Sequence, residues 1–112
     1  MDPSVVLPSV ITNYQDAHDR HDVATALLQF TPDAEVTDEG RTYRGAAGVE
    51  TFLRTAAAEF TFTRTLVEAT EAARDEWVVT NHLEGDFPGA VADLRYRFRL
   101  VGDLISRLEI AP

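Results

Sequence analysis

The sequence contains no cysteine and no lysine, and all ten of its basic residues are arginine. The absence of cysteine excludes disulfide bonds, thiolate catalysis and cysteine-ligated metals. No apolar run approaches the roughly 20 residues that a membrane-spanning helix needs. The N-terminal stretch MDPSVVLPSV lacks the basic flank and the long apolar segment that are typical of signal peptides. From these absences we expect a cytoplasmic protein.

Positive charge is also scarce, because the formal net charge is −9 at pH 7. Nucleic acids and anionic membrane surfaces are bound through a basic face, so this charge argues against both as partners. The 112 residues suit one domain, residues 1–112, and an apolar content of 45% is enough for a hydrophobic core. The acidic excess favours solubility but identifies no partner.

Helical periodicity is the main pattern in the first half of the chain. A first helix is expected from about Pro8, and its inner face would consist of Val10, Ile11, Tyr14, Ala17, His18 and His21. Asp22 is placed to cap a second helix, which carries Val23, Ala26, Leu27 and Phe30 on one face and ends at Pro32. A third helix, from Gly45 to about Phe60, has an apolar stripe of Val49, Phe52, Leu53, Ala56, Ala57 and Phe60.

Strand patterns follow, first as short segments at 33–40 and 41–45 and then as four longer runs. These runs are rich in β-branched and aromatic residues and cover 60–72, 76–87, 91–101 and 104–111. Three helices followed by a meander of strands predict an α+β fold, with the helices covering one face of a curved antiparallel sheet. The concave side of such a sheet would enclose a ligand pocket.

The two central strand patterns each have an inner and an outer face. Leu94, Tyr96 and Phe98 alternate with Arg95, Arg97 and Arg99. In the preceding run, Trp77, Val79, Asn81 and Leu83 share one face, and Val78, Thr80, His82, Glu84 and Asp86 share the other. Asn81 would point inward and could orient a ligand carbonyl, whereas His82 would point outward. The arginines would pair with the acidic face across the sheet or contribute to a dimer interface.

The segment YQDAHDRHD, residues 14–22, concentrates polar side chains and permits two interpretations. His18 and His21 are three positions apart and could share a metal ion, but zinc needs about four ligands and no later segment supplies an obvious partner. Alternatively, the segment is a polar junction between two helices in which Asp22 caps the second.

Several features recur together in one known family. They are Tyr14 in the first helix, Asp22 at the junction, PDA at 32–34, VTD at 36–38, Gly45, and FRLVGDLISRLEI at 98–110. With these features the chain resembles the SnoaL-like, ketosteroid-isomerase-like branch of the nuclear transport factor 2-like superfamily. The resemblance implies a cone-shaped, cystatin-like α+β fold, in which a curved antiparallel sheet wraps around three N-terminal helices. It also implies a homodimer formed through the outer sheet face.

The resemblance places Tyr14 and Asp38 on the catalytic positions of ketosteroid isomerases. Asp38 would act as the general base, and Tyr14 would donate a hydrogen bond to the enolate oxygen. Leu94 stands where those isomerases have a second oxyanion acid and cannot donate, although Tyr96 on the same face is a candidate replacement. The residues alone allow other roles, since Asp38 could cap the DEGR turn and Tyr14 could be a core aromatic.

Two functions from different classes follow from these residues. The first is a cofactor-independent enzyme, without metal, that catalyses proton transfer on a small hydrophobic carbonyl compound, as isomerases, cyclases and dehydratases do. Its substrate pocket would be lined by Phe52, Phe62, Trp77, Asn81, Leu94, Tyr96 and Phe98. The second is a non-catalytic ligand-binding or dimerisation module. A weaker third possibility, epoxide hydrolysis, requires an inward arginine beside Asp38, and the alternation points the strand arginines outward.

Overall fold

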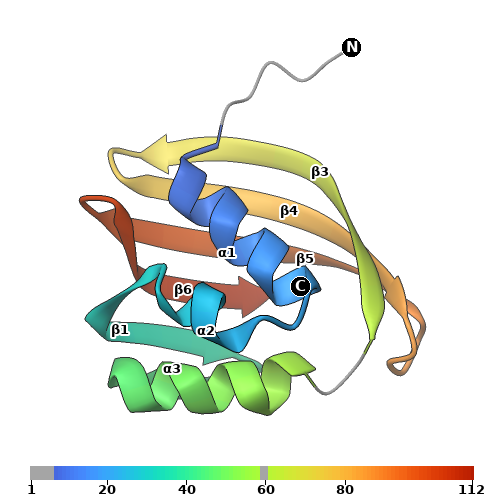
Figure 1. Cartoon of the computed structure of the whole chain (residues 1–112). Helices are drawn as coiled ribbons and strands as arrows, with labels where there is room; N and C mark the ends of the chain where they lie inside the picture. Colours follow the sequence, from blue (N-terminus) through green and yellow to red (C-terminus); the bar gives the residue numbers. More distant parts are fainter. Residues whose placement is uncertain (1–6, 59–60) are drawn as a thin grey trace.

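The computed structural model of the protein describes residues 7–58 and 61–112. Their elements are α1 (Ser9–Asp19), α2 (Val23–Leu27), β1 (Phe30–Asp38), β2 (Arg41–Arg44), α3 (Gly45–Arg54), the 3₁₀ turn η1 (Ala56–Ala58), β3 (Phe62–Ala73), β4 (Glu76–Gly85), β5 (Val91–Val101) and β6 (Leu104–Ala111). Within these residues the strands form one sheet in the order β2-β1-β6-β5-β4-β3, in which only β1 and β6 pair in parallel. The helices lie on one face of the sheet (Figure 1), so the expected α+β architecture is confirmed.

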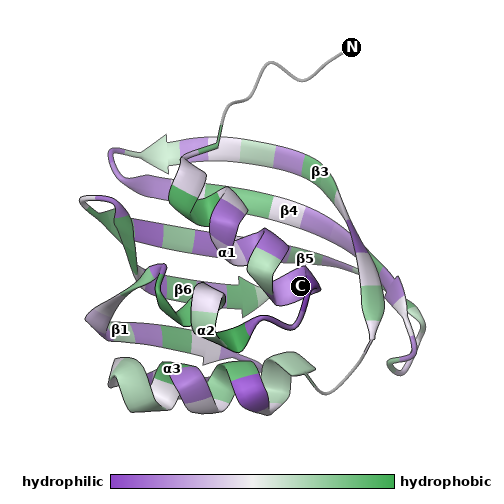
Figure 2. Cartoon of the chain, viewed as in Figure 1, coloured by the Kyte–Doolittle hydropathy of each residue, from purple (hydrophilic) through white to green (hydrophobic). Residues whose placement is uncertain are grey.

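The sheet is strongly curved toward the helices. Two register shifts interrupt the pairing of β3 with β4, and one interrupts the pairing of β5 with β6. Such bulges bend a strand and increase its twist, and β3 bends markedly along its length in Figure 1. Apolar and polar residues alternate along the strands (Figure 2), and the buried apolar side chains of helices and sheet form one core cluster. Its largest fully buried side chains include Tyr14, Phe52 and Phe98.

The first helix ends two residues before the expected His21 because of the geometry of its last turn. His21 has a φ of 57°, in the left-handed region. Its amide donates to the His18 carbonyl at 3.0 Å, and the Asp22 amide donates to the Ala17 carbonyl at 2.9 Å. This pair of hydrogen bonds is a Schellman motif, which stops a helix. Asp22 then caps α2 by accepting from the Thr25 amide at 3.1 Å, as predicted.

The expectation that Phe30 lies in the second helix is wrong. α2 ends at Leu27, and Phe30 opens β1 opposite Ile105 of β6. Pro32 therefore lies inside a strand. The β1–β6 register shifts between Phe30 and Glu35, and a proline is tolerated at such an irregularity because no ladder hydrogen bond is lost.

The third helix is shorter than expected. α3 ends at Arg54, and Thr55 leaves the helical region with φ −115° and ψ −84°. The Thr55 hydroxyl donates to the Thr51 carbonyl at 2.6 Å, a local hydrogen bond of the kind that competes with helix continuation. The expected helix end at Phe60 lies outside the described residues, as do residues 1–6 of the N-terminal stretch.

The alternation in β4 and β5 is confirmed. Asn81 is fully buried on the inner face, whereas His82 lies on the outer face opposite Asp93 of β5. The three β5 arginines are exposed, and Arg99 forms a 3.9 Å ion pair with Glu76 of β4. Across residues 7–58 and 61–112, no helix has the length and apolar character needed to cross a membrane.

Candidate functional site

A pocket of about 400 Å³ lies on the concave side of the sheet. Its walls are mostly apolar, and its polar groups come from α1, β5 and the end of β1. The lining residues are Tyr14, His18, Asp38, Glu39, Phe52, Ala56, Ala57, Phe62, Leu83, Phe87, Pro88, Ala92, Leu94, Tyr96 and Ile110. An apolar cavity with a few convergent polar groups is the usual form of a small-molecule site.

Tyr14 forms part of the inner wall of this pocket from the middle of α1. The residue is only 1% exposed. Its ring packs edge-on against Phe30, with centroids 5.3 Å apart, and against Phe98, with centroids 6.0 Å apart. These contacts fix the position of the ring. Tyr14 is therefore both a core aromatic and a pocket residue, so the two interpretations of the sequence do not exclude each other.

Asp38 reaches the pocket from the end of β1. Strand alternation puts it on the same face as Ala34 and Val36, which are fully buried. The chain then turns through Glu39 and Gly40, whose φ values of 53° and 78° are both in the left-handed region. The turn leaves Asp38 and Glu39 together at the pocket wall.

Tyr96 lines the pocket from the inner face of β5 and is 7% exposed. Its ring stacks on Phe98 with an interplanar angle of 20°. Burial, followed by the charge of Asp38, raises the pKa of Tyr96 to about 12. Burial also raises the pKa of Tyr14 well above its usual value, with smaller contributions from Tyr96 and Asp38. Both phenols are therefore protonated hydrogen-bond donors near neutral pH.

Of the residues predicted to bind substrate, Phe52, Phe62, Leu94 and Tyr96 line the pocket together with Tyr14 and Asp38. The other three, Trp77, Asn81 and Phe98, are not part of its lining. Phe98 is fully buried beneath the two tyrosine rings, and Asn81 is also fully buried. Trp77 lies opposite Phe98 and packs against the core. Alternation gave the correct face for these three residues but not their position along the strands relative to the cavity.

His18 is a pocket residue that the polar-junction interpretation missed. It lies one helical turn after Tyr14, and its side chain is 16% exposed. Its ring lies 5.7 Å from that of Phe62 and 6.2 Å from that of Tyr14, measured between centroids. Burial lowers the pKa of His18, against the opposing effects of Asp19 and the Ala57 backbone. The spacing of residues 14 and 18 was the available signal, since residues four apart share a helix face.

Arg64 corrects the expectation that all strand arginines point outward. It lies on the inner face of β3 and its side chain is only 14% exposed. Its Nη2 donates to Asp19 Oδ2 at 2.8 Å, and its Nη1 donates to Gln15 Oε1 at 3.3 Å. The guanidinium therefore joins β3 to the end of α1. It is not among the residues that line the pocket with Asp38.

His18 and His21 share the lining of a second cavity of about 200 Å³, but only His18 also lines the pocket with Tyr14 and Asp38. His21 is exposed in the turn after α1, whereas His18 faces the pocket. Among the residues that the structure describes, no group of three or more histidine, aspartate or glutamate side chains could hold a metal ion.

The fold and the pocket define a nuclear transport factor 2-like domain. The sequence model of the SnoaL-like domain matches residues 11–108, and the chain belongs to that family. No curated protein sequence matches the chain with significance.

Solved structures support this assignment. A provisionally named polyketide cyclase from Sinorhizobium meliloti shares 30% identity, with a TM-score of 0.87 and coverage of 94% of this chain and 95% of that one. A Catenulispora acidiphila protein with a ketosteroid isomerase-like fold, solved with trimethylamine, has a TM-score of 0.81 at 18% identity and coverage of 96% and 87%. A Mycobacterium tuberculosis protein in complex with estradiol-17beta-hemisuccinate has a TM-score of 0.77 at 18% identity and coverage of 93% and 91%. The last two show likeness of fold alone.

Proposed function

We propose that the protein is an enzyme that moves a proton within a small hydrophobic carbonyl compound, as in isomerisation, aldol-type cyclisation or dehydration. The observation that carries this proposal is that two neighbouring carboxylates, Asp38 and Glu39, and two phenols line the same apolar pocket. The charge of Asp38 contributes to the raised pKa of both Tyr14 and Tyr96. The family relationship to a provisionally named polyketide cyclase, and the steroid ester bound by a protein of the same fold, support a ligand of this class.

Asp38 is the proposed general base. Removal of a proton from the carbon next to a carbonyl leaves an enolate, whose negative charge is on the oxygen. A carboxylate beside the substrate takes this proton and can return it to another carbon, which requires only a side chain in reach of both positions. The apolar walls exclude water and strengthen the electrostatic interactions within the pocket.

Tyr14 and Tyr96 are the proposed donors to the enolate oxygen. Their raised pKa values keep both hydroxyl groups protonated while charge develops on the substrate. Donors that are fixed before the reaction and aimed at the developing charge contribute strongly to enzymatic rate acceleration. In this arrangement Tyr96 supplies the second donor that Leu94 cannot supply.

The base is tested by proton exchange with a simple ketone. β-Tetralone is incubated with the protein in D₂O, and loss of the proton signal next to its carbonyl is followed by NMR. We expect Asp38→Asn to slow this exchange by roughly 100-fold or more. Asp33→Asn is the matched control, because Asp33 is exposed on the same strand and bonds only to Thr31 among the described hydrogen bonds. Equal exchange by wild type and Asp38→Asn would contradict the proposal.

The donors are tested by binding of β-naphthol, which resembles the enol of β-tetralone. Tyr14→Phe and Tyr96→Phe should each weaken binding by up to about tenfold, the effect of one lost hydrogen bond. Tyr43→Phe is the control, because Tyr43 packs on Phe52 from outside this pocket. Tight β-naphthol binding without any β-tetralone exchange would assign the pocket to ligand binding alone.

A further inference from the structure

His18 has a position in the pocket that the proposed proton transfer does not use. It lines the 400 Å³ pocket and also a neighbouring cavity of about 200 Å³ between the α1–α2 junction and α3. Ala57 is the other residue shared by both cavities. The imidazole thus stands where the two cavities meet, one helical turn from the phenol of Tyr14.

Burial is the main reason that the ring of His18 is neutral near neutral pH, because it lowers the pKa of the imidazole. Its Nδ1 is 3.9 Å from Asp19 Oδ1, which is too long for a hydrogen bond. The Asp19 carboxylate instead accepts from Arg64, at 3.2 Å from Nε and 2.8 Å from Nη2. His21 in the following turn and Arg64 on β3 add smaller effects that also lower the pKa of His18.

A neutral imidazole has one donor nitrogen and one acceptor nitrogen. The Ala57 backbone acts on the ring as a hydrogen-bond acceptor that raises its pKa, which places the donor nitrogen on that side. Among residues 7–58 and 61–112, no side chain forms a hydrogen bond with a ring nitrogen of His18, so the second nitrogen is available to a ligand. An acceptor in a mostly apolar pocket gains most when a ligand hydroxyl donates to it.

We propose that His18 selects ligands that carry a hydroxyl group, which donates to its free ring nitrogen. Tyr14 and Tyr96 hold the carbonyl of the same ligand. This position of the carbonyl is taken from the proposed function, on which the inference therefore rests. The substrate class becomes a hydroxylated cyclic carbonyl compound whose two oxygens are separated by an apolar skeleton. Phe62 and Leu94 line the same pocket and provide apolar contacts for that skeleton.

The test compares β-naphthol with the isomeric naphthalenediols, which add one hydroxyl at different ring positions. At neutral pH we expect at least one diol to bind wild type about tenfold more tightly than β-naphthol, as one added hydrogen bond allows. His18→Phe should remove this preference and keep β-naphthol binding. His18→Gln, whose amide oxygen is also an acceptor, should restore part of it.

Two further readouts separate a hydrogen bond from simple packing. The preference for the diol should disappear as pH falls through the pKa of His18, because the imidazolium has no acceptor nitrogen. In ¹⁵N NMR, the free ring nitrogen should shift when the diol binds but not when β-naphthol binds. In Tyr14→Phe, both ligands should bind more weakly while the preference between them is kept.

Equal affinity of wild type for β-naphthol and every diol would overturn the inference, as would a preference that survives in His18→Phe. Failure of the proposed function is distinguishable, because it is measured by β-tetralone exchange. A His18-dependent diol preference without exchange would support the hydroxyl site and reject the catalytic role. Exchange of β-tetralone without a preference for any diol would support the catalytic role and reject the hydroxyl site.

Discussion

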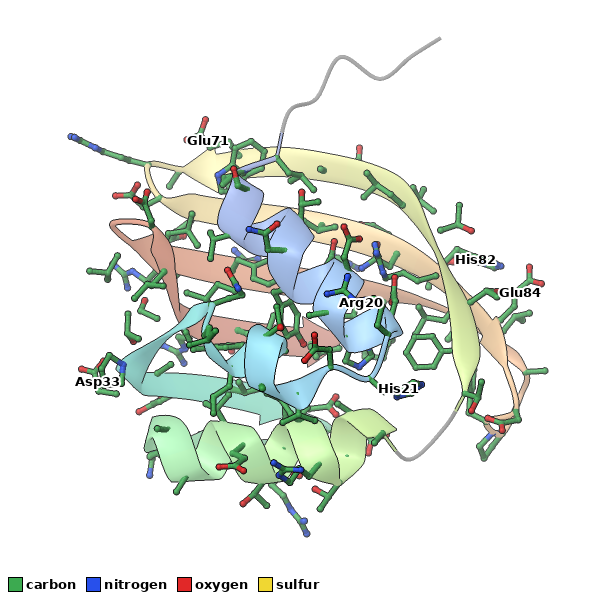
Figure 3. All side chains as sticks on the ribbon, in the orientation of Figure 1. Arg20, His21, Asp33, Glu71, His82 and Glu84 are labelled. Atoms are coloured by element: carbon green, nitrogen blue, oxygen red, sulfur yellow. The ribbon has the colours of Figure 1, made fainter. Side chains whose placement is uncertain are left out.

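The surroundings of His18 and His82 shift the pKa values of these two histidines in opposite directions. His18 is buried, and its pKa is lowered. His82 lies on the outer face, with Nδ1 2.6 Å from Asp93 Oδ1 and Nε2 2.9 Å from Glu84 Oε2. Figure 3 shows His82 and Glu84 together along β4. The hydrogen bond to Asp93, followed by that to Glu84, raises the pKa of His82, because only the imidazolium can donate from both nitrogens.

This contrast predicts the order in which the two rings titrate. The NMR signal of His18 should titrate below about pH 6.5 and that of His82 above it. Asp93→Asn should lower the pKa of His82 and leave that of His18 unchanged. The pKa of His82 is higher in the folded state than in the unfolded state. The stability that protonated His82 contributes is therefore fully present below the unfolded-state pKa and is lost as the pH rises through the folded-state pKa.

Unfolding midpoints in urea should therefore differ most between wild type and Asp93→Asn on the acidic side of neutrality and converge at alkaline pH. Asp103→Asn is the control, since Asp103 is exposed in the β5–β6 turn. A stability difference that grows with rising pH would show that the Asp93 carboxylate acts through something other than the His82 charge. The β3 residue opposite His82 is Thr65, which carries no charge.

At the scale of elements, Arg64 joins β3 to the helix that carries Tyr14 and His18. Its Nε contacts both carboxylate oxygens of Asp19 at 3.2 Å, and its Nη1 donates to Gln15, which is 3% exposed. Planar donation of this kind is specific to arginine. Removal of the guanidinium would leave the buried Gln15 amide without its donor.

We therefore expect Arg64→Ala to destabilise the protein by about 1–3 kcal/mol, the usual cost of losing a hydrogen bond to a charged group. Arg64→Lys should recover only part of this loss, because a lysine ammonium group cannot reproduce the planar set of donors that the guanidinium presents to Asp19 and Gln15. Arg54→Ala is the control, since Arg54 forms an exposed i,i+4 pair with Glu50 and should cost about 0.5 kcal/mol or less. The measurement is chemical unfolding, and equal losses for Arg64→Ala and Arg54→Ala would contradict the structural role of Arg64.

The elements themselves were predictable to different degrees. The four long strands were recognisable because alternation and turn residues are local signals. Helix ends were not, because they depend on the left-handed turn at His21 and on the hydroxyl of Thr55. Local periodicity predicts a helix at Phe30, because the sheet partner of this residue, Ile105, is far away in the sequence.

The candidate site was predictable where family resemblance supplied positions. Tyr14 and Asp38 come from that resemblance, and both line the pocket. Alternation placed Asn81 and Phe98 on the inner face, but which inner residues reach a cavity depends on helix packing. Helical periodicity places His18 on the correct helix face, but its burial depends on contacts with Phe62, which is distant in the sequence.

At the scale of the whole molecule, the outer sheet face combines features of an interface between two copies. Along β5 it carries the exposed Val91 and Val101, at 56% and 60%, on either side of the three arginines. Neighbouring outward residues include the acidic Glu84 and Glu109 on β4 and β6. A face with both signs of charge can be complementary to itself about a two-fold axis, as a symmetric dimer requires.

We therefore expect the protein to sediment as a homodimer. Arg97→Glu, in the middle of the β5 row, should shift it toward monomer without changing its unfolding temperature at low concentration, because an exposed arginine contributes little to the fold. Arg74→Glu makes the same charge change in the exposed β3–β4 turn, at an end of the sheet, and should leave the dimer intact. Dissociation by both variants would attribute the effect to net charge, which is already −9. Dissociation by Arg97→Glu alone would assign the interface to this face, and a wild-type monomer across the micromolar range would exclude it.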